Sequence, residues 1–195
     1  MAWNRQTERV ITVGVCAAVI GVADSLIKGN GFGLLGALGQ TAAPWLMLAF
    51  LAGAFAGERR LTLGAFAGLE ATLLGLVGFY FVNSFVVDLG SHAWPTDLRL
   101  AVTGGKWVFA LSVLSGPIFG ALGTWWRRQL SMIPVIILAL LFVGEALVRV
   151  IEAHIFVQYV DQASTIEVLS ALAWTVLAVE ITKALRREEN SANVR

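Results

Sequence analysis

Long runs of apolar residues, separated by short polar segments, dominate the pattern along this chain. A helix needs about 20 mostly apolar residues to cross a bilayer. Six runs approach that length, and we expect each to form one transmembrane helix. Their ranges are about 10–27, 42–56, 61–87, 98–126, 133–151 and 165–185. The pattern predicts an all-α polytopic membrane protein, a bundle of about six transmembrane helices in a single integral membrane domain over residues 1–195.

The prolines within these runs agree with helices. Pro44 and Pro134 fall in the first turns of their runs, where a missing N–H costs little. Pro117 lies in the middle of the long fourth run, where we expect a kink. The first run follows Arg5 and Arg9, which is also typical of a cleaved signal peptide. Because further apolar runs follow at once, we interpret it as the first helix.

The distribution of Lys and Arg predicts the orientation, since short cytoplasmic segments are enriched in these residues. One side of the membrane would hold Arg5, Arg9, Arg59, Arg60, Arg127, Arg128, Lys183, Arg186, Arg187 and Arg195. The other would hold only Lys28 and Arg99, with Lys106 and Arg149 just inside its helices. With six spans, both termini lie on the rich side. The bias predicts a multi-pass protein of the cell (cytoplasmic) membrane with its N- and C-termini inside.

The amino-acid composition also indicates that lipid surrounds this protein. Hydrophobic residues make up 57% of the chain, charged residues 14%, and the mean hydropathy is +0.77, whereas soluble domains carry roughly 25% charged residues. A net charge of +1 and the lack of a large basic cluster argue against nucleic acid as a partner. Cys16 is the single cysteine, which excludes an internal disulfide and a cysteine-based metal cluster.

The fifth run carries three charged residues on one helix face. Glu145, Arg149 and Glu152 fall within about 60° of each other around a helix. Arg149 can therefore bridge both carboxylates near the outer end of the helix. Such a triad either only neutralises itself, or it forms a polar wall on which Arg149 holds a ligand carboxylate or phosphate through its planar fork.

Further polar residues are expected at a similar depth. Asp24 and Lys28 are spaced as a helical pair near the outer end of the first run, and Lys106 lies about two turns inside the fourth. Asn83, with Tyr80 and Ser84, makes the outer third of the third run polar. Because charges in a span usually face the bundle interior, these groups predict an outward-facing ligand pocket.

Two other carboxylates are separate from this set. Glu70 lies about 14 Å into the membrane from Leu61, near the midplane. It is a structural hydrogen-bonding group, a proton or cation site, or a ligand contact. Glu180 lies nearer the inner interface, where pairing with Lys183 is expected.

Trp174 and the glycines leave alternatives open. Trp174 lies near the middle of the sixth run, either as packing bulk or as a wall of a binding site. The chain has 20 glycines. Small residues recur at the spacing that lets helix backbones approach closely, at Gly14/Ala18, Gly53/Gly57, Gly64/Gly68 and Gly116/Gly120. These pairs pack within the bundle or form a docking face for another subunit.

Six short spans, inner termini and elaborated outer loops resemble the substrate-binding (S) subunits of energy-coupling-factor transporters. The segment from Pro44 to Gly68 is similar to the second and third helices of that group. Gly14, Ala17, Ala18 and Gly21 are similar to the small-residue face by which their first helix docks. The resemblance implies a transmembrane coupling subunit and cytoplasmic ATPases as partners. Lys28-Gly29 and Ala43-Pro44-Trp45 also resemble uncharacterised six-span membrane proteins of actinobacteria, which implies no activity.

No catalytic motif accompanies these features. The chain has no H-E-x-x-H, no G-x-S-x-G and no phosphate-binding loop, so we expect no enzymatic activity and no cofactor. The favoured hypothesis is a substrate-binding membrane subunit of a small-solute transporter. The alternatives are a non-catalytic subunit or scaffold of an export or immunity complex, and a proton- or cation-coupled carrier that uses Glu70.

Overall fold

The computed structural model describes residues 2–29, 41–57, 60–84, 96, 99, 102–155 and 162–193. Within these residues, the side chains at 2–5, 28–29, 152–155, 162–167 and 188–193 lie outside the description. The helices are α1 (Ala2–Gly29), α3 (Ala43–Ala56), α4 (Leu61–Val82), α6 (Lys106–Gln129), α7 (Ile133–Ile155) and α8 (Gln162–Asn193). The described part of the chain contains no strand, which confirms the all-α prediction.

The surface of this bundle is apolar, as a protein immersed in lipid requires. Five described helices are long and apolar enough to cross a membrane. Leu111, Leu140 and Val176 are each more than 60% exposed. In water so much exposed apolar surface would drive aggregation, whereas in a bilayer it is solvated by acyl chains. The chain is therefore a multi-pass membrane protein.

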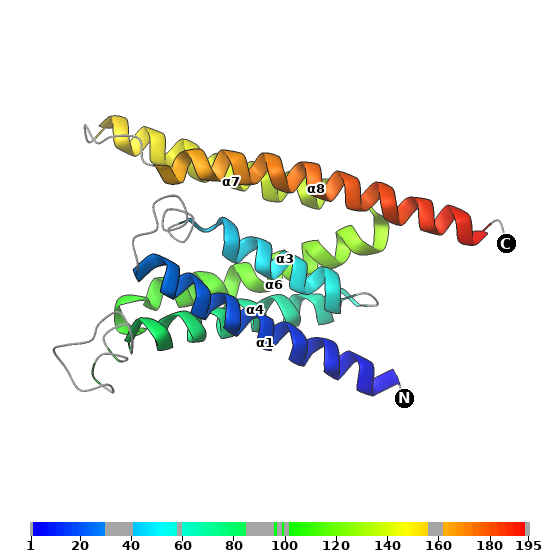
Figure 1. Ribbon diagram of the computed structural model, residues 1–195, viewed down its shortest axis with the longest axis horizontal. Coiled ribbons are helices and arrows are strands. Elements are labelled where there is room, and N and C mark those ends of the chain that lie inside the picture. Colours follow the sequence, from blue (N-terminus) through cyan, green and yellow to red (C-terminus); the bar gives the residue numbers. More distant parts are fainter. Residues whose placement is uncertain are drawn as a thin grey trace.

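The sixth apolar helix, α3, has 14 residues, and at 1.5 Å per residue it extends about 21 Å. It is shorter than the roughly 30 Å hydrocarbon core of a bilayer. Figure 1 shows the helices aligned along one direction, with both chain ends at the same end of the bundle. We call the opposite end, where α1 and α7 end and α3 and α8 begin, the distal end.

One boundary differs from the sequence prediction in a way that moves a candidate residue. The fourth run was expected to form one helix from residue 98. The described residues 99 and 102–104 are helical, but Gly105 separates them from α6, which begins at Lys106. Gly105 precedes it with φ −85° and ψ 6°, outside helical geometry, and Gly104 comes before that. Two consecutive glycines interrupt a helix easily because they favour it least of all residues except proline. Lys106 therefore starts α6 instead of lying two turns inside it.

The prolines occupy the positions that were expected. Pro44 and Pro134 lie in the first turns of α3 and α7. Pro117 lies inside α6, and the helix continues past it to Gln129.

Glycine contacts hold α3, α4 and α6 together. A Cβ at Gly53 of α3 would overlap the backbone of Gly120 in α6, and one at Gly68 of α4 would overlap the carbonyl of Gly116. Thr124 of α6 is fully buried in this region and donates to the carbonyl of Gly53 at 2.9 Å. In lipid, close backbone packing and such interhelical hydrogen bonds replace the hydrophobic effect as the attraction between helices.

The helix α1 packs against α4 in the same manner. Gly21 lies against the carbonyl of Gly75, and Gly78 lies against the carbonyl of Ala18. Ala17 is completely buried beside them. The small-residue face of α1, which the resemblance implied would dock on another subunit, is thus covered by α4 of the same chain. The sequence left open whether these small residues pack within the bundle or dock another subunit. The contacts described for them join helices of the same chain.

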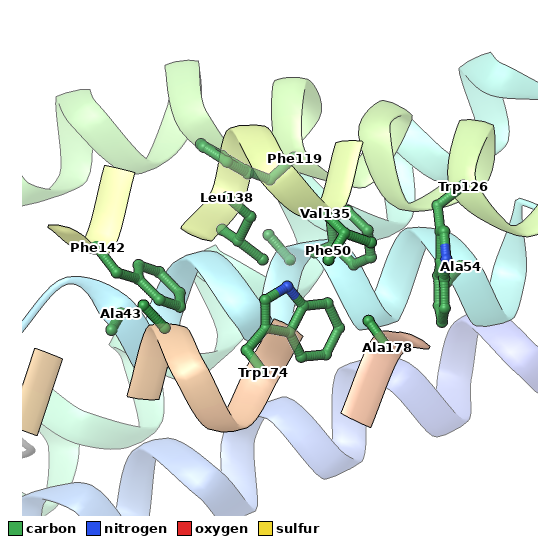
Figure 2. Close-up of a cluster of buried hydrophobic side chains, with 12 residues drawn as sticks. Ala43, Phe50, Ala54, Phe119, Trp126, Val135, Leu138, Phe142, Trp174 and Ala178 are labelled. Carbon is green, nitrogen blue, oxygen red and sulfur yellow. The ribbon is translucent and has the colours of Figure 1, made fainter. Parts of the chain in front are cut away.

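The helices α7 and α8 form a hairpin that docks on α3 and α6 through large side chains. Trp174 of α8 meets Phe50 of α3 in an edge-to-face arrangement, with ring centroids 5.3 Å apart. Figure 2 shows Leu138 and Phe142 of α7 around the same cluster. At the end that carries the termini, Trp126 Nε1 of α6 donates to Thr182 Oγ1 of α8 at 3.1 Å. The hairpin is therefore fixed to the glycine-packed helices by an aromatic core.

Candidate functional site

The best-defined charged contact joins α7 to the start of α3. Both carboxylate oxygens of Glu145 accept the backbone N–H of Ala42, at 3.1 and 3.2 Å. Ala42 is the N-cap residue of α3, and its methyl side chain offers no capping oxygen. Glu145 supplies that oxygen from another helix, in the role that the glutamate of a capping box has within one helix. Its negative charge also lies at the positive end of the α3 dipole.

Arg149 pairs with the same carboxylate. Its Nη2 lies 3.3 Å from Glu145 Oε1, one helical turn along α7, and both side chains are about a quarter exposed. This contact confirms the predicted Glu145–Arg149 pair. The side chain of Glu152 lies outside the described residues, so the third member of the triad stays a prediction. Arg149 lies one turn beyond Glu145 toward the distal end of α7, and Glu145 is also engaged with α3.

The structure brings Asp24 and Asn83 to neighbouring helices. Both are half-buried and lie at the distal ends of α1 and α4, which pack together along their length. Beside them, the Ser25 and Ser84 hydroxyls are buried and have no hydrogen-bond partner among the described residues. A buried hydroxyl without a partner costs free energy, so this end of the α1–α4 contact is polar and incompletely satisfied. The side chain of Lys28 lies outside the described residues.

Lys106 belongs to another helix, α6. It is exposed at the first residue of α6, with its ammonium nitrogen 5.9 Å from the ring centroid of Trp107. One turn later, Phe109 stacks on Tyr80 of α4, with centroids 5.3 Å apart. The predicted group of charges is thus divided over α1, α4, α6 and α7, and the structure pairs Glu145 with Arg149.

Glu70 lies in the middle of α4, against α1. A Cβ at Gly14 would come within 2.8 Å of Glu70 Oε1, so the absence of a side chain at Gly14 leaves the space that the carboxyl group fills. The other oxygen, Oε2, is buried without a hydrogen-bond partner among the described residues. Glu180, by contrast, is exposed and accepts from Lys183 Nζ at 2.7 Å, as predicted.

A groove lies between α1, α3 and α8 in the distal half of the bundle. Of the residues that line it, the sequence had suggested only Trp174 as a binding-site wall. Its volume is about 410 Å³. Its lining is apolar except for Ser170 and includes Ile20 of α1, Met47 and Leu51 of α3, and Trp174 of α8. Trp174 was predicted either to fill the core or to form a wall of a binding site. At 1% exposure it packs in the core, and it also lines this groove, while its role in a binding site stays a prediction.

The groove and the charged contact are adjacent. Ala43 and Pro44 line the groove, and the preceding residue, Ala42, holds Glu145. The described lining includes none of the predicted charged residues; of these, Glu145 contacts Ala42, next to the lining. Among the residues that the structure describes, no three His, Cys, Asp or Glu side chains are grouped to hold a metal ion.

Comparison with known proteins gives a family but no activity. A family model described as "Family of unknown function (DUF6518)" matches residues 2–190. No curated protein and no solved structure matches the chain.

Proposed function

The chain belongs to this family of unknown function, so its activity has to be argued from its geometry, and we propose that it is the substrate-binding membrane subunit of a small-solute transporter. The single observation that carries the proposal is the groove between α1, α3 and α8. Ligand sites are typically concave spaces of about 300–1,000 Å³ with mostly apolar walls and a few polar groups. At about 410 Å³, with Trp174 as a wall and Ser170 as a hydroxyl, the groove fits that description.

The groove indicates the chemistry of the solute. Its walls favour a largely apolar body, because Met47, Leu51 and Leu177 offer no hydrogen bonds. The Glu145–Arg149 pair at its distal mouth favours a polar or anionic head group, since the guanidinium fork binds carboxylate and phosphate well. A small amphipathic solute meets both conditions.

This role has consequences for location and partners. Such a subunit has no catalytic activity and would reside in a bacterial inner membrane with both termini in the cytoplasm. It would receive its solute from outside, and energy for transport would come from a transmembrane coupling subunit with cytoplasmic ATPases. Because α4 covers the small-residue face of α1, that partner would bind elsewhere on the apolar surface.

Filling the groove tests the proposal. Ala173 lines the groove and is exposed, whereas the neighbouring Leu172 is 60% exposed and is not among the lining residues. We expect native mass spectrometry of the gently solubilised wild type to show a bound small molecule. Ala173→Trp should lose it, while the matched control Leu172→Trp should keep it.

Two results would contradict this function. One is a wild type that carries no small molecule but co-purifies with a stoichiometric membrane protein, which favours the scaffold alternative. The other is equal retention of the small molecule by both tryptophan variants, which would place it outside the groove.

A further inference from the structure

Glu70 lies near the centre of α4. It is nine residues from Leu61, the start of α4, which is about 14 Å at 1.5 Å per residue. The helix has 22 residues, so Glu70 is near its centre. If α4 crosses the bilayer along its length, both termini of the helix are at the interfaces and Glu70 is near the midplane.

The surroundings of this carboxyl group are almost entirely apolar. The space next to Oε1 is bounded by Gly14 of α1 and by Leu74 one turn further along α4. Oε2 is buried and has no hydrogen-bond partner among the described residues. Ala17 and Ala71, both fully buried, belong to the apolar cluster at the same contact between α1 and α4.

No described cation faces Glu70 from the helices that pack against α4. On α1, Arg9 lies over the ring of Phe55, 5.6 Å from its centroid, at the end of the bundle that carries the termini. Asp24 is at the distal end of α1, and Cys16 is exposed. The helix α3 contains no ionisable residue, and the charged residues of α6 lie at its ends, at Lys106, Arg127 and Arg128.

Protonation is the remaining way to stabilise the group. An ionised carboxylate in hydrocarbon is strongly destabilised unless a cation or several donors compensate it. A metal cation would itself need several further oxygen ligands, and the described residues form no acidic cluster that supplies them. We infer that Glu70 is a proton-binding site at the contact between α1 and α4, with Gly14 providing the space for the neutral carboxyl group. This inference is independent of the proposed transport function.

The site couples protonation to helix packing. The neutral carboxyl group fits into the space at Gly14, whereas the ionised form requires water or a cation there. Loss of the proton therefore favours separation of α1 from α4 at this depth. A proton- or cation-coupled carrier is one use of such a site, and a pH-dependent conformational change is another.

Infrared spectroscopy of the full-length protein in lipid vesicles tests the inference. We expect the wild type at neutral pH to show the C=O band of a protonated carboxyl group in an apolar environment. Glu70→Gln, which keeps the shape without the titratable group, should lose this band. Glu180→Gln is the matched control and should keep it, because Glu180 is exposed and paired with Lys183.

Chemical modification gives a second measurement. Dicyclohexylcarbodiimide enters the bilayer and adds to a protonated carboxyl group, which transfers its proton to the reagent and forms a stable N-acylurea after rearrangement. Mass spectrometry should place the adduct on Glu70 in the wild type and in Glu180→Gln, and labelling should fall as the pH rises. Identical infrared spectra of wild type and Glu70→Gln at neutral pH would overturn the inference, as would labelling that does not change with pH.

Discussion

Glu145 and Ala42 are 103 positions apart in the sequence, yet the Glu145 carboxylate accepts the backbone N–H of Ala42 through both oxygens. The contact ties the hairpin of α7 and α8 to the first turn of α3. It also stands at the mouth of the groove that we propose as the solute site. Glu145, which we predicted as a ligand-binding group from its spacing to Arg149, therefore also caps α3.

Replacing Glu145 by alanine should destabilise the protein. The change removes a charge-assisted hydrogen bond and the favourable interaction with the α3 dipole, and we expect the free energy of unfolding to fall by about 1–3 kcal/mol. Unfolding in mixed detergent micelles measures this difference. Glu180→Ala removes an exposed pair and should leave stability nearly unchanged, so equal effects of the two changes would refute the capping role.

Close packing at Gly53 predicts a severe effect of a small substitution. Because a Cβ there would overlap the backbone of Gly120, Gly53→Ala should force α3 and α6 apart and cost about 3 kcal/mol. A Cβ at Gly144 of α7 would meet no described atom within 4 Å. Gly144→Ala should therefore raise stability by about 0.5–1 kcal/mol through helix propensity. Thermal unfolding followed by circular dichroism compares the two, and similar melting temperatures would count against the packing.

The buried hydroxyl of Thr124 should contribute to the contact between α3 and α6. It donates to the carbonyls of Gly53 and Gly120 at 2.9 and 3.1 Å. Thr124→Val keeps the shape and removes the donor, so we expect a loss of about 0.5–1.5 kcal/mol. Thr175 donates only to Ala171 of its own helix among its described contacts, and Thr175→Val should be close to neutral. Reversal of this order would show that the interhelical hydrogen bond is unimportant.

Arg149 should matter for solute binding more than for folding. The contact with Ala42 is made by Glu145, so Arg149→Ala leaves the cap of α3 in place. We expect this variant to stay helical and to lose the bound small molecule in native mass spectra. Arg187, exposed at the other end of the bundle, is the control, and Arg187→Ala should retain the molecule. Full retention by Arg149→Ala would remove Arg149 from the site.

The predicted orientation can be tested with single cysteines. In a Cys16→Ala background, Thr96→Cys and Arg128→Cys each introduce one exposed thiol. If both termini are cytoplasmic, a membrane-impermeant maleimide added to intact cells should label Thr96→Cys and not Arg128→Cys. The opposite pattern would reverse the topology.

Local interactions in the candidate site were predictable because helix geometry alone determines them. Glu145 with Arg149 and Glu180 with Lys183 are three or four residues apart, and any helix places such residues together. The break at Gly105, just before α6, was not predicted, since an apolar run does not show where consecutive glycines interrupt a helix. Lys106 is exposed at the first residue of α6.

The sequence by itself determined that this chain is a bundle of apolar helices, because only lipid can solvate so many long apolar runs. The tertiary structure decided which helices touch, and with that the glycine contacts of α6, the place of Glu70 beside Gly14, and the groove next to Trp174. The reason is physical. In a membrane both the lipid-facing and the buried side of a helix are apolar, so hydrophobic periodicity does not indicate which side faces inward. Only the fit of side chains and backbones between distant segments makes that choice.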